Sequence, residues 1–579
     1  MLLSGLFVSL LAIATSNVWA QSGTVDSFIA SESPIAKTGL LANIGSSGSK
    51  SSGAKSGVVI ASPSKQDPDY VYTWTRDSAL VFQWIIDQVT FGRDASLRSQ
   101  VDNYVASTAR IQQISNPSGT ITTGGLGEPK FNVDETAFTG AWGRPQRDGP
   151  PLRAIALISW GNYLLSSNNQ SYVTSTLWPI IQRDLDYTAQ YWNQTGFDLW
   201  EEVSSSSFFT TAVQHKALVQ GAAFATAIGQ TSSASTYSAQ APNVLCFLQS
   251  YWNSAQGYVT ANTGGGRSGK DANTVLTSIH TFDPAAGCDA NTFQPCSDKA
   301  LSSLVQYVNA FRSIYAINSG IASNQPAATG RYPEDTYYGG NPWYLTTLAV
   351  AEQLYDSLYV WDQQKSLNVT ATSLPFFQSF SSGITVGTYP STTSTYTTLT
   401  TAIKNYADGF VAVVAKYTPS DGSLAEQYTR ANGTPISAKD LTWSYASALT
   451  AFGARAGQVP GTWGAKGLTV PATCSSNGGG GSGNTVAVTF NVQATTTFGE
   501  NIFLTGSVDA LKNWSPENAI ALSSANYPTW SVTVNVPAST AIEYKYIRKF
   551  NGAITWESDP NRRFTTPSSG SYTLNDSWR

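Results

Sequence analysis

A run of glycine and serine at positions 475–484 divides this chain into two parts that differ in their hydrophobic period. Before the run, apolar residues recur every three or four positions, as over residues 301–308, which is the spacing of a buried helical face. After it they alternate, as over residues 486–492, which is typical of a strand with one buried face. The sequence therefore predicts an all-α domain over residues 21–474, a flexible linker, and a small all-β domain over residues 485–579.

The first domain shows many helical segments and no convincing strands between them. This pattern favours a barrel of paired helices, whereas the second domain suits an antiparallel sandwich or barrel. The helical spacing is clearest over Ala79–Val89, Leu152–Leu165, Trp178–Tyr191, Thr211–Ile228, Leu301–Tyr315, Leu348–Leu358, Ile403–Val414 and Leu441–Phe452. The loops between these helices are long enough for one mouth of such a barrel to collect functional side chains.

The amino terminus resembles a secretory leader. The apolar stretch Leu2–Ala14 is followed by small and polar residues, and a cleavage site is expected near Ala20. No later apolar run is long enough to span a bilayer, and the net charge of −4 shows no basic surface for nucleic acid. We therefore expect a secreted monomer with no membrane or nucleic-acid partner. The candidate glycosylation sites are Asn169, Asn193, Asn368, Asn432, Asn513 and Asn575.

The chain has four cysteines, which allow three pairings. Cys288 and Cys296 flank a short loop, so we expect a local disulfide between them. Cys246 and Cys474 would then form a second disulfide that ties the end of the first domain back to its middle. A zinc site is the alternative, although no Cys-x-x-Cys pair supports it.

Five short islands combine aromatic rings, carboxylates and arginines in a chain whose charged residues make up only 12%. They are Tyr70–Asp77, Trp142–Asp148, Phe197–Glu202, Arg331–Tyr337 and Glu426–Tyr428. The apolar face of a sugar ring can stack on an aromatic side chain while its hydroxyls bond to carboxylates and guanidiniums. A carbohydrate is therefore the first ligand that the islands indicate.

Carboxylates are the reactive groups that this composition offers. The two histidines, His215 and His280, argue against a Ser-His-Asp triad and a histidine-ligated metal centre, and no metal or cofactor is expected. Glycoside hydrolysis needs one protonated and one ionised carboxyl group. Glu201 follows Trp200 directly and precedes a second carboxylate, which should raise its pKa and suit it to act as a general acid. Glu426 is the best candidate for the partner, and Asp198, Glu334 and Asp335 compete with it.

Several longer motifs resemble those of fungal glucoamylases, glycoside hydrolase family 15. The motifs are Asp69–Asp77, Gly127–Thr136, Trp142–Gly149, Tyr191–Glu202 and Gly330–Tyr338. The segment Trp556–Arg562 is similar to part of the starch-binding domain of carbohydrate-binding module family 20. Together the two resemblances cover essentially the whole chain, in the same order as in these families.

The resemblance implies an (α/α)6 barrel that releases β-D-glucose from the non-reducing ends of starch and maltodextrins. Hydrolysis would proceed with inversion and without a cofactor, on α-1,4 bonds and more slowly on α-1,6 bonds. It implies that Glu201 is the general acid and that Glu426 is the general base. The residues that it assigns to the sugar pocket are Tyr70, Trp74, Arg76, Asp77, Trp142, Asp198, Leu199, Glu202, Arg331, Asp335, Trp343 and Trp443.

In the small domain, the same resemblance assigns two starch-binding sites and therefore predicts attachment to starch granules. The first is formed by Trp514, Lys545, Trp556 and Asn561. The second includes Tyr527 and Trp530, and its usual polar contacts are reduced because Ala525 replaces an acidic residue.

Two other functions remain compatible with these residues. The barrel of a non-catalytic starch-binding lectin would keep the aromatic islands without their chemistry, and the presence of both Glu201 and Glu426 argues against it. A related enzyme could act on another α-glucan, such as isomaltose or trehalose, and a substrate panel distinguishes that case.

Overall fold

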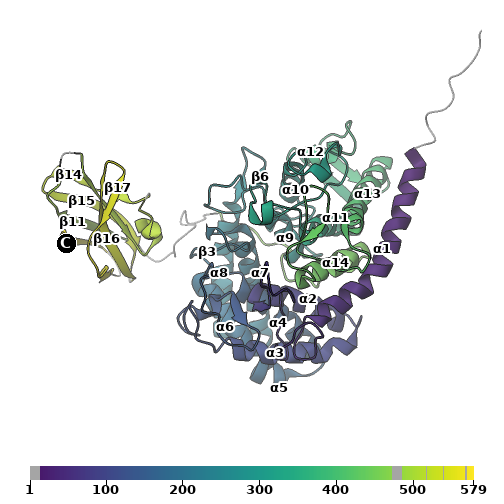
Figure 1. The fold of residues 1–579 in the computed structure, drawn as a ribbon, viewed down its shortest axis with the longest axis horizontal. Helices are drawn as coiled ribbons and strands as arrows, with labels where there is room; N and C mark the ends of the chain where they lie inside the picture. Colours follow the sequence, from purple (N-terminus) through teal and green to yellow (C-terminus); the bar gives the residue numbers. More distant parts are fainter. Residues whose placement is uncertain (1–13, 473–484, 498, 517, 539, 568–569) are drawn as a thin grey trace, which may run out of the picture. The chain divides into compact units, whose positions relative to one another are not determined.

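Figure 1 shows the computed structural model of the chain, which describes residues 14–472, 485–497, 499–516, 518–538, 540–567 and 570–579. The chain forms two compact units, Met1–Cys474 and Ser475–Arg579. Positions 475–484, where the linker is predicted, lie outside the described residues.

Helices dominate the first unit. They are α1 (Ala14–Ala42), α2 (Thr75–Thr90), α3 (Arg98–Ile111), α4 (Gly149–Ser166), α5 (Gln170–Tyr172), α6 (Trp178–Tyr191), α7 (Phe208–Ala227), α8 (Thr231–Gln249), α9 (Asn273–His280), α10 (Asp298–Ala310), α11 (Tyr344–Gln364), α12 (Leu374–Gln378), α13 (Ser394–Tyr417) and α14 (Thr442–Arg455). Short strand pairs join the loops, namely β1 (Tyr72–Trp74) with β2 (Lys130–Asn132), β3 (Gly196–Phe197) with β4 (Ser204–Ser205), β5 (Trp252–Asn253) with β6 (Tyr258–Val259), β7 (Ser366–Val369) with β8 (Gly387–Pro390), and β9 (Gln427–Tyr428) with β10 (Pro435–Ile436).

The longer helices form an inner ring and an outer layer. The inner helices α2, α4, α7, α9, α11 and α14 contact one another in this order, and α14 closes the ring by contacting α2. Buried residues occur all round α7 and α11, because an inner helix has neighbours on every side. The outer helix α3 instead buries one stripe, which includes Val101, Tyr104 and Val105. The predicted (α/α)6 barrel is confirmed.

Each expected helix overlaps an observed one, and Trp178–Tyr191 matches α6 at both ends. Two helices are clearly longer than predicted, since α13 already begins at Ser394, before Ile403, and α11 ends at Gln364, beyond Leu358. The main omission is α1, since we assigned its first residues to the leader. This helix begins at Ala14 and runs through the expected cleavage site at Ala20, so cleavage there would leave its remaining turns. The other helices that were not predicted are α3, α8, α9 and the short α5 and α12.

The N-terminal ends of the inner helices lie at one end of the barrel. Trp74 precedes α2, Trp343 precedes α11, and Trp443 lies in the first turn of α14. All three line one cavity, so these helix starts lie close together. Arg76 and Asp77 belong to the first turn of α2 and not to the loop before it. The islands of the sequence therefore meet at this end because each inner helix starts there.

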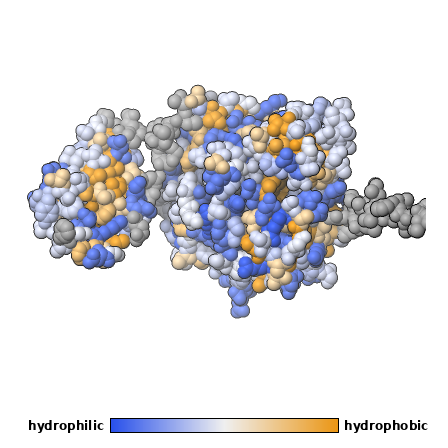
Figure 2. Space-filling view, turned by 90° about the horizontal axis from the view of Figure 1, so that it is seen from above, coloured by the Kyte–Doolittle hydropathy of each residue, from blue (hydrophilic) through white to orange (hydrophobic). Residues whose placement is uncertain are grey.

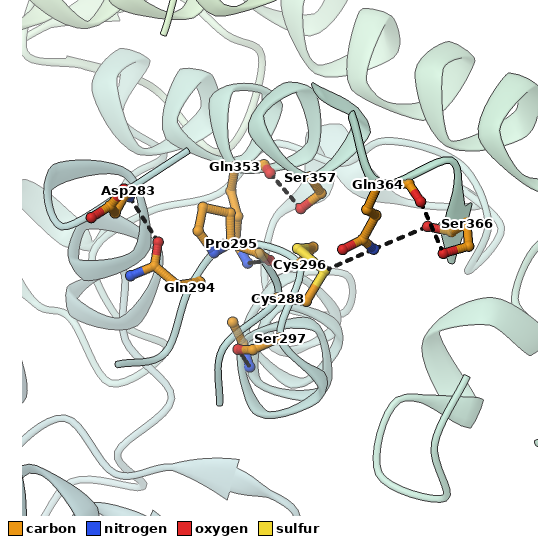
Figure 3. Close-up of a disulfide and its surroundings, with 11 residues drawn as sticks. Asp283, Cys288, Gln294, Pro295, Cys296, Ser297, Gln353, Ser357, Gln364 and Ser366 are labelled. Carbon is orange, nitrogen blue, oxygen red and sulfur yellow. Dashed lines mark hydrogen bonds between the residues drawn. A yellow bond between two sulfur atoms is a disulfide. The ribbon is translucent and has the colours of Figure 1, made fainter. Parts of the chain in front are cut away.

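Cys288 and Cys296 form a disulfide with a Cα–Cα distance of 4.8 Å, which confirms the local pairing (Figure 3). The loop that carries it is fixed to α11, because Gln353 donates a hydrogen bond to the carbonyl of Pro295. The other predicted pair, Cys246–Cys474, cannot be described because Cys474 lies outside the described residues.

The second unit is a β-sandwich. One sheet has the order β14 (Ser523–Asn526), β15 (Thr529–Pro537), β11 (Thr485–Gln493), β19 (Ser571–Ser577); the other has β13 (Ile520–Ala521), β12 (Asn501–Gly506), β16 (Ala541–Phe550), β17 (Ala553–Trp556), and β18 (Arg562–Thr565) also pairs with β16. The alternating residues from Val486 to Val492 point into its core, as predicted. One detail differs from the expected antiparallel arrangement, since β11 and β19 run parallel.

The visible surface of the barrel is mostly hydrophilic, with scattered hydrophobic residues (Figure 2). In the described part of the chain, no helix combines the length and the apolar character that crossing a membrane requires. None of the candidate glycosylation sites whose side chains are described is buried; these are Asn169, Asn193, Asn368, Asn432 and Asn575.

Candidate active site

A cavity of about 610 Å³ opens at the end of the barrel where the inner helices begin. It is lined by Ala61, Pro68, Asp69, Tyr70, Tyr72, Trp74, Arg76, Asp77, Lys130, Phe138, Trp142, Gly143, Leu199, Trp200, Glu201, Glu202, Arg331, Tyr337, Tyr338, Trp343, Glu426, Leu441 and Trp443. Aromatic rings and ionisable groups are both frequent in this wall. That combination suits a ligand with apolar faces and many hydroxyls.

Glu201 lies in the tight turn between β3 and β4, where its backbone adopts a left-handed φ of 67°. Its N–H donates to the carbonyl of Asp198 at 2.8 Å, and the buried Asp198 carboxylate accepts the N–H groups of Glu202 and Val203. Arg76 approaches Glu201 Oε1 at 3.2 Å. Burial raises the pKa of Glu201 even though Arg76 acts in the opposite direction.

Glu426 enters the cavity from the loop before β9. Its Oε2 accepts hydrogen bonds from Gln427 Nε2 at 2.9 Å and from the Ser437 hydroxyl. Burial raises the pKa of Glu426, and hydrogen bonds from Ser437, Gln427 and Tyr70 partly oppose this rise. The donors on Oε2 thus hold the carboxylate in place in the cavity wall.

Glu202 differs from its neighbour because positive charge surrounds it. Arg331 donates to its Oε1 at 2.9 Å, while Arg267 at 2.6 Å and the Tyr332 hydroxyl donate to its Oε2. Burial would raise the pKa of Glu202, but these donors outweigh it and lower the pKa below its usual range. Adjacent glutamates therefore have pKa values shifted in opposite directions, which is the arrangement that separates a proton donor from a carboxylate.

Arg76 and Asp77 contribute charge from the first turn of α2. The Arg76 guanidinium is buried and donates to Gln146 Oε1 and Asp148 Oδ2, both at 2.9 Å. Burial raises the pKa of Asp77 to about 7, although Arg76 opposes this shift. Both side chains line the cavity, as the sequence predicted.

Lys130 lines the cavity although the sequence did not predict it as a pocket residue. Its Nζ lies 3.6 Å from the centroid of the Trp142 ring, and it also stands over the rings of Tyr72, Trp74 and Phe138. Burial lowers the pKa of Lys130 to about 8. Lys130 belongs to the motif Gly127–Thr136 noted above. The motif alone could not show that four aromatic rings surround this lysine in the folded chain.

Most predicted pocket residues line the cavity, and two do not. Those that line it are Tyr70, Trp74, Arg76, Asp77, Trp142, Leu199, Glu201, Glu202, Arg331, Trp343, Glu426 and Trp443. Asp198 lies behind the wall, where it stabilises the Glu201 turn as described above. Asp335 accepts two hydrogen bonds from Arg331, at 2.7 and 2.8 Å. Both aspartates therefore support pocket residues. They do not line the cavity and so do not offer the direct contacts with the sugar that we expected.

The first predicted starch site of the small unit surrounds β16. Lys545 donates to Asp559 Oδ1 at 2.6 Å, and two positions earlier on the same face Glu543 accepts from Asn561 at 2.8 Å. The Trp556 ring is 39% exposed on the neighbouring strand β17. Trp514 ends the short helix that follows β12 and is partly exposed. These residues come from β16, from the neighbouring strand β17, from the short helix after β12 and from the loop before β18.

The second predicted site keeps only one of its two rings at the surface. Tyr527 is 51% exposed, which leaves a face for a sugar. Trp530 is only 3% exposed, and its Nε1 donates to the carbonyl of Ala494. We correct its assignment: Trp530 is a core residue of the sandwich, since its position on β15 points inward.

No group of three or more histidine, cysteine, aspartate or glutamate side chains in the described ranges is arranged to hold a metal ion. The cavity offers paired carboxylates instead, in a wall of aromatic rings and guanidiniums. Such a site is chemically suited to proton transfer at a glycosidic oxygen.

Comparison with known proteins agrees with this chemistry. The model of glycosyl hydrolases family 15 matches residues 34–453, and that of a starch binding domain matches residues 485–576. The chain belongs to glycosyl hydrolase family 15. It is 68% identical over 561 residues to Glucoamylase-1 of Schizophyllum commune, with 97% of each protein covered, and 51% identical over 595 residues to a glucoamylase of Neurospora crassa, with 96% of this chain and 94% of the relative covered.

Solved structures of family 15 confirm the fold. The glucoamylase from Hypocrea jecorina superposes with a TM-score of 0.77 at 51% identity, covering 96% of this chain and all of that chain. The glucoamylase of Hormoconis resinae gives 0.75 at 44% identity, covering 95% and 98%. The chain is therefore a starch-degrading glycoside hydrolase, a glucan 1,4-α-glucosidase with a starch-binding domain.

Proposed function

We propose that this family 15 enzyme is an exo-acting, inverting hydrolase that releases β-D-glucose from the non-reducing ends of starch and maltodextrins. Glu201 is the general acid that protonates the glycosidic oxygen, and Glu426 is the general base that activates water. The enzyme cleaves α-1,4 bonds, and α-1,6 bonds more slowly. It acts without a cofactor.

One observation supports this assignment most strongly. Glu201 and Glu426 come from loops that are more than two hundred positions apart in the chain, yet both line the same cavity. The two hydrogen bonds that hold Oε2 of Glu426 suit a base that must keep its orientation while it receives a proton from water. The raised pKa of Glu201 suits a group that is protonated before it reacts.

The other pocket residues fit a terminal glucose unit. Arg76, Glu202 and Arg331 present charged donors and acceptors for its hydroxyls, while Trp142 and Trp343 offer rings on which it can stack. An internal glucose carries chain on both sides, so a pocket that holds one terminal sugar accounts for attack from the chain end.

The stereochemistry of the first product tests the proposal. We expect proton NMR of a maltotriose digest to show β-glucose first, with the α anomer rising later at the rate of free glucose. A parallel sample of pure β-glucose in the same buffer controls for that interconversion. If the α anomer formed first, Glu426 would not be activating water on the opposite face of the sugar.

Ser437 is expected to control the acid side of the pH profile. Its hydroxyl stabilises the ionised form of Glu426, so Ser437→Ala should raise the pKa of that carboxyl. A base must be deprotonated to act, so the acidic limb of kcat/KM should move to higher pH, by about one unit. The measurement is kcat/KM for maltose between pH 3 and 8.

Ser444→Ala provides the matched control. Ser444 donates to the carbonyl of Ala425 and not to a carboxylate, so its removal should leave the acidic limb unmoved. An unchanged limb in Ser437→Ala, or an equal shift in both variants, would contradict this role of Ser437.

The remaining features of the proposal concern partners and location. The small domain is expected to hold the enzyme on starch granules through Trp514, Lys545, Trp556, Asn561 and Tyr527. We propose that the protein is secreted as a monomer after cleavage near Ala20, and that it carries glycans at some of the asparagines named above. Light scattering of the purified protein tests the monomer, and sequencing of its amino terminus tests the cleavage.

A further inference from the structure

Arg267 contacts the reactive region from outside the cavity wall. It donates to Glu202 Oε2 at 2.6 Å, and its Nη1 lies 3.8 Å from Asp198 Oδ2. Its guanidinium carbon lies 3.7 Å above the centre of the Tyr332 ring. The side chain is 19% exposed and does not line the cavity. It therefore reaches the substrate only through the residues that it holds.

The loop that carries Arg267 is fitted closely to the Glu201–Glu202 turn. At Gly265, whose φ is +92°, an added Cβ would lie 2.7 Å from the Val203 side chain, so no larger residue fits there. The N–H of Ser268 donates to Glu334 Oε1 at 2.9 Å, and the N–H of Ala261 donates to the carbonyl of Gly269. The position of the guanidinium is thus set by the fold and not by a free surface chain.

Arg267 and Arg331 hold Glu202 from two directions. Arg331 takes Oε1, whereas Arg267 and Tyr332 take Oε2, so both oxygens are engaged and the carboxylate has little freedom to rotate. The charged and titratable groups around Glu202 are these three, together with Glu201 and Asp198 of its own turn. Asp271, which accepts from Trp200 Nε1, is the next carboxyl near Arg267.

We propose that Arg267 is a positioning residue that keeps Glu202 ionised and aimed into the cavity, so that the proton of this adjacent pair resides on Glu201. The proposal rests on the proposed role of Glu201 as the general acid. Without Arg267, Glu202 would lose one of its two cationic partners and could rotate or take up a proton. It would then bind sugar hydroxyls less well and would compete with Glu201 for the proton.

Arg267 can be tested more cleanly than Arg331. Arg331 is 4% exposed and also holds Asp335, so its removal would take the cationic partner from a buried aspartate as well as one of the two from Glu202. Arg267 lies at the edge of the site, where water can replace it. The variants are Arg267→Gln, which removes the charge, and Arg267→Lys, which keeps it.

The first measurement is the pH profile of kcat/KM for maltose together with the melting temperature. We expect Arg267→Gln to lower kcat/KM by about 10–100-fold and to move the acidic limb to higher pH, because Glu202 protonates more readily. Arg267→Lys should restore most of the pH profile. Arg110→Gln is the control, since Arg110 also pairs with a glutamate, Glu135, away from the cavity.

Three outcomes would overturn the proposal. An unchanged profile in Arg267→Gln would show that Glu202 does not depend on this arginine. An equal shift in Arg110→Gln would show a general effect of charge. A loss of activity in which the melting temperature falls in parallel, with the acidic limb unmoved and no rescue by lysine, would show a structural role alone.

A binding measurement separates this inference from the proposed function. Calorimetry compares maltose binding to Glu201→Gln and to the double variant Glu201→Gln/Arg267→Gln. We expect the double variant to bind at least several-fold more weakly. Equal affinities would overturn the role of Arg267 alone, whereas rapid hydrolysis of maltose by Glu201→Gln would overturn the proposed function and with it the assignment of the proton.

Discussion

Glu201→Gln and Glu426→Gln are each expected to lower kcat on maltose by about 10²–10⁴-fold while changing KM little. Glutamine keeps the size of the side chain and most of its hydrogen bonds. It can neither donate a proton to the glycosidic oxygen nor accept one from water. Both side chains are largely buried in the cavity wall, where hydrogen bonds hold them. The measurement is glucose release from maltose and soluble starch.

A matched exchange far from the chemistry is the control for these variants. Glu135→Gln alters a glutamate that binds Arg110 and Ser107 and does not line the cavity, so kcat should stay within about twofold. The double variant Glu201→Gln/Glu426→Gln should be little slower than either single one, because groups that act together are not additive. Substantial activity in either single variant would refute the assignment.

Removal of the small domain is expected to have the second large effect, and only on solid substrate. A chain that ends at Gly483 should hydrolyse soluble maltodextrin at the full rate, since the cavity belongs entirely to the first unit. On starch granules its activity should fall about 10–100-fold, because the tethered domain no longer raises the local concentration of substrate. The measurement is glucose release from granules and from maltodextrin at equal enzyme concentration.

Trp556→Ala in the intact chain refines this test. Its ring is exposed on β17, so the substitution should weaken granule binding without unfolding the sandwich. Trp530→Ala should instead lower the melting temperature of the small domain, because that ring lies in its core. An equal loss on granules and on soluble substrate after truncation would contradict separable domains.

The positions of the two domains and of most helices followed from local pattern. Hydrophobic period is a property of a short segment, so the change from helical spacing to alternation at residues 475–484 was visible without a structure. The motifs around Arg76, Glu201 and Arg331 were equally visible, because the residues that make up each motif are close neighbours in the chain.

Local sequence pattern could not show whether a given side chain faces the ligand or the interior of its domain. Trp530 was assigned to a starch site together with Tyr527, yet Tyr527 lies in the turn between β14 and β15 and reaches the surface, whereas Trp530 on β15 is buried in the core. Asp198 and Asp335 looked like sugar ligands because they lie in the right motifs. In the folded chain they accept hydrogen bonds from backbone N–H groups and from Arg331.

The residue types, their motifs and the kinds of secondary structure were therefore readable from the chain, because each depends on neighbours a few positions away. The folded barrel decided which groups meet, since α7, α9 and α11 begin at one end and bring Glu202, Arg267 and Arg331 together from the separate loops before them. Burial and charge then depend on these distant partners. For that reason the opposite pKa shifts of Glu201 and Glu202, two adjacent residues of the same type, arise only in the tertiary structure.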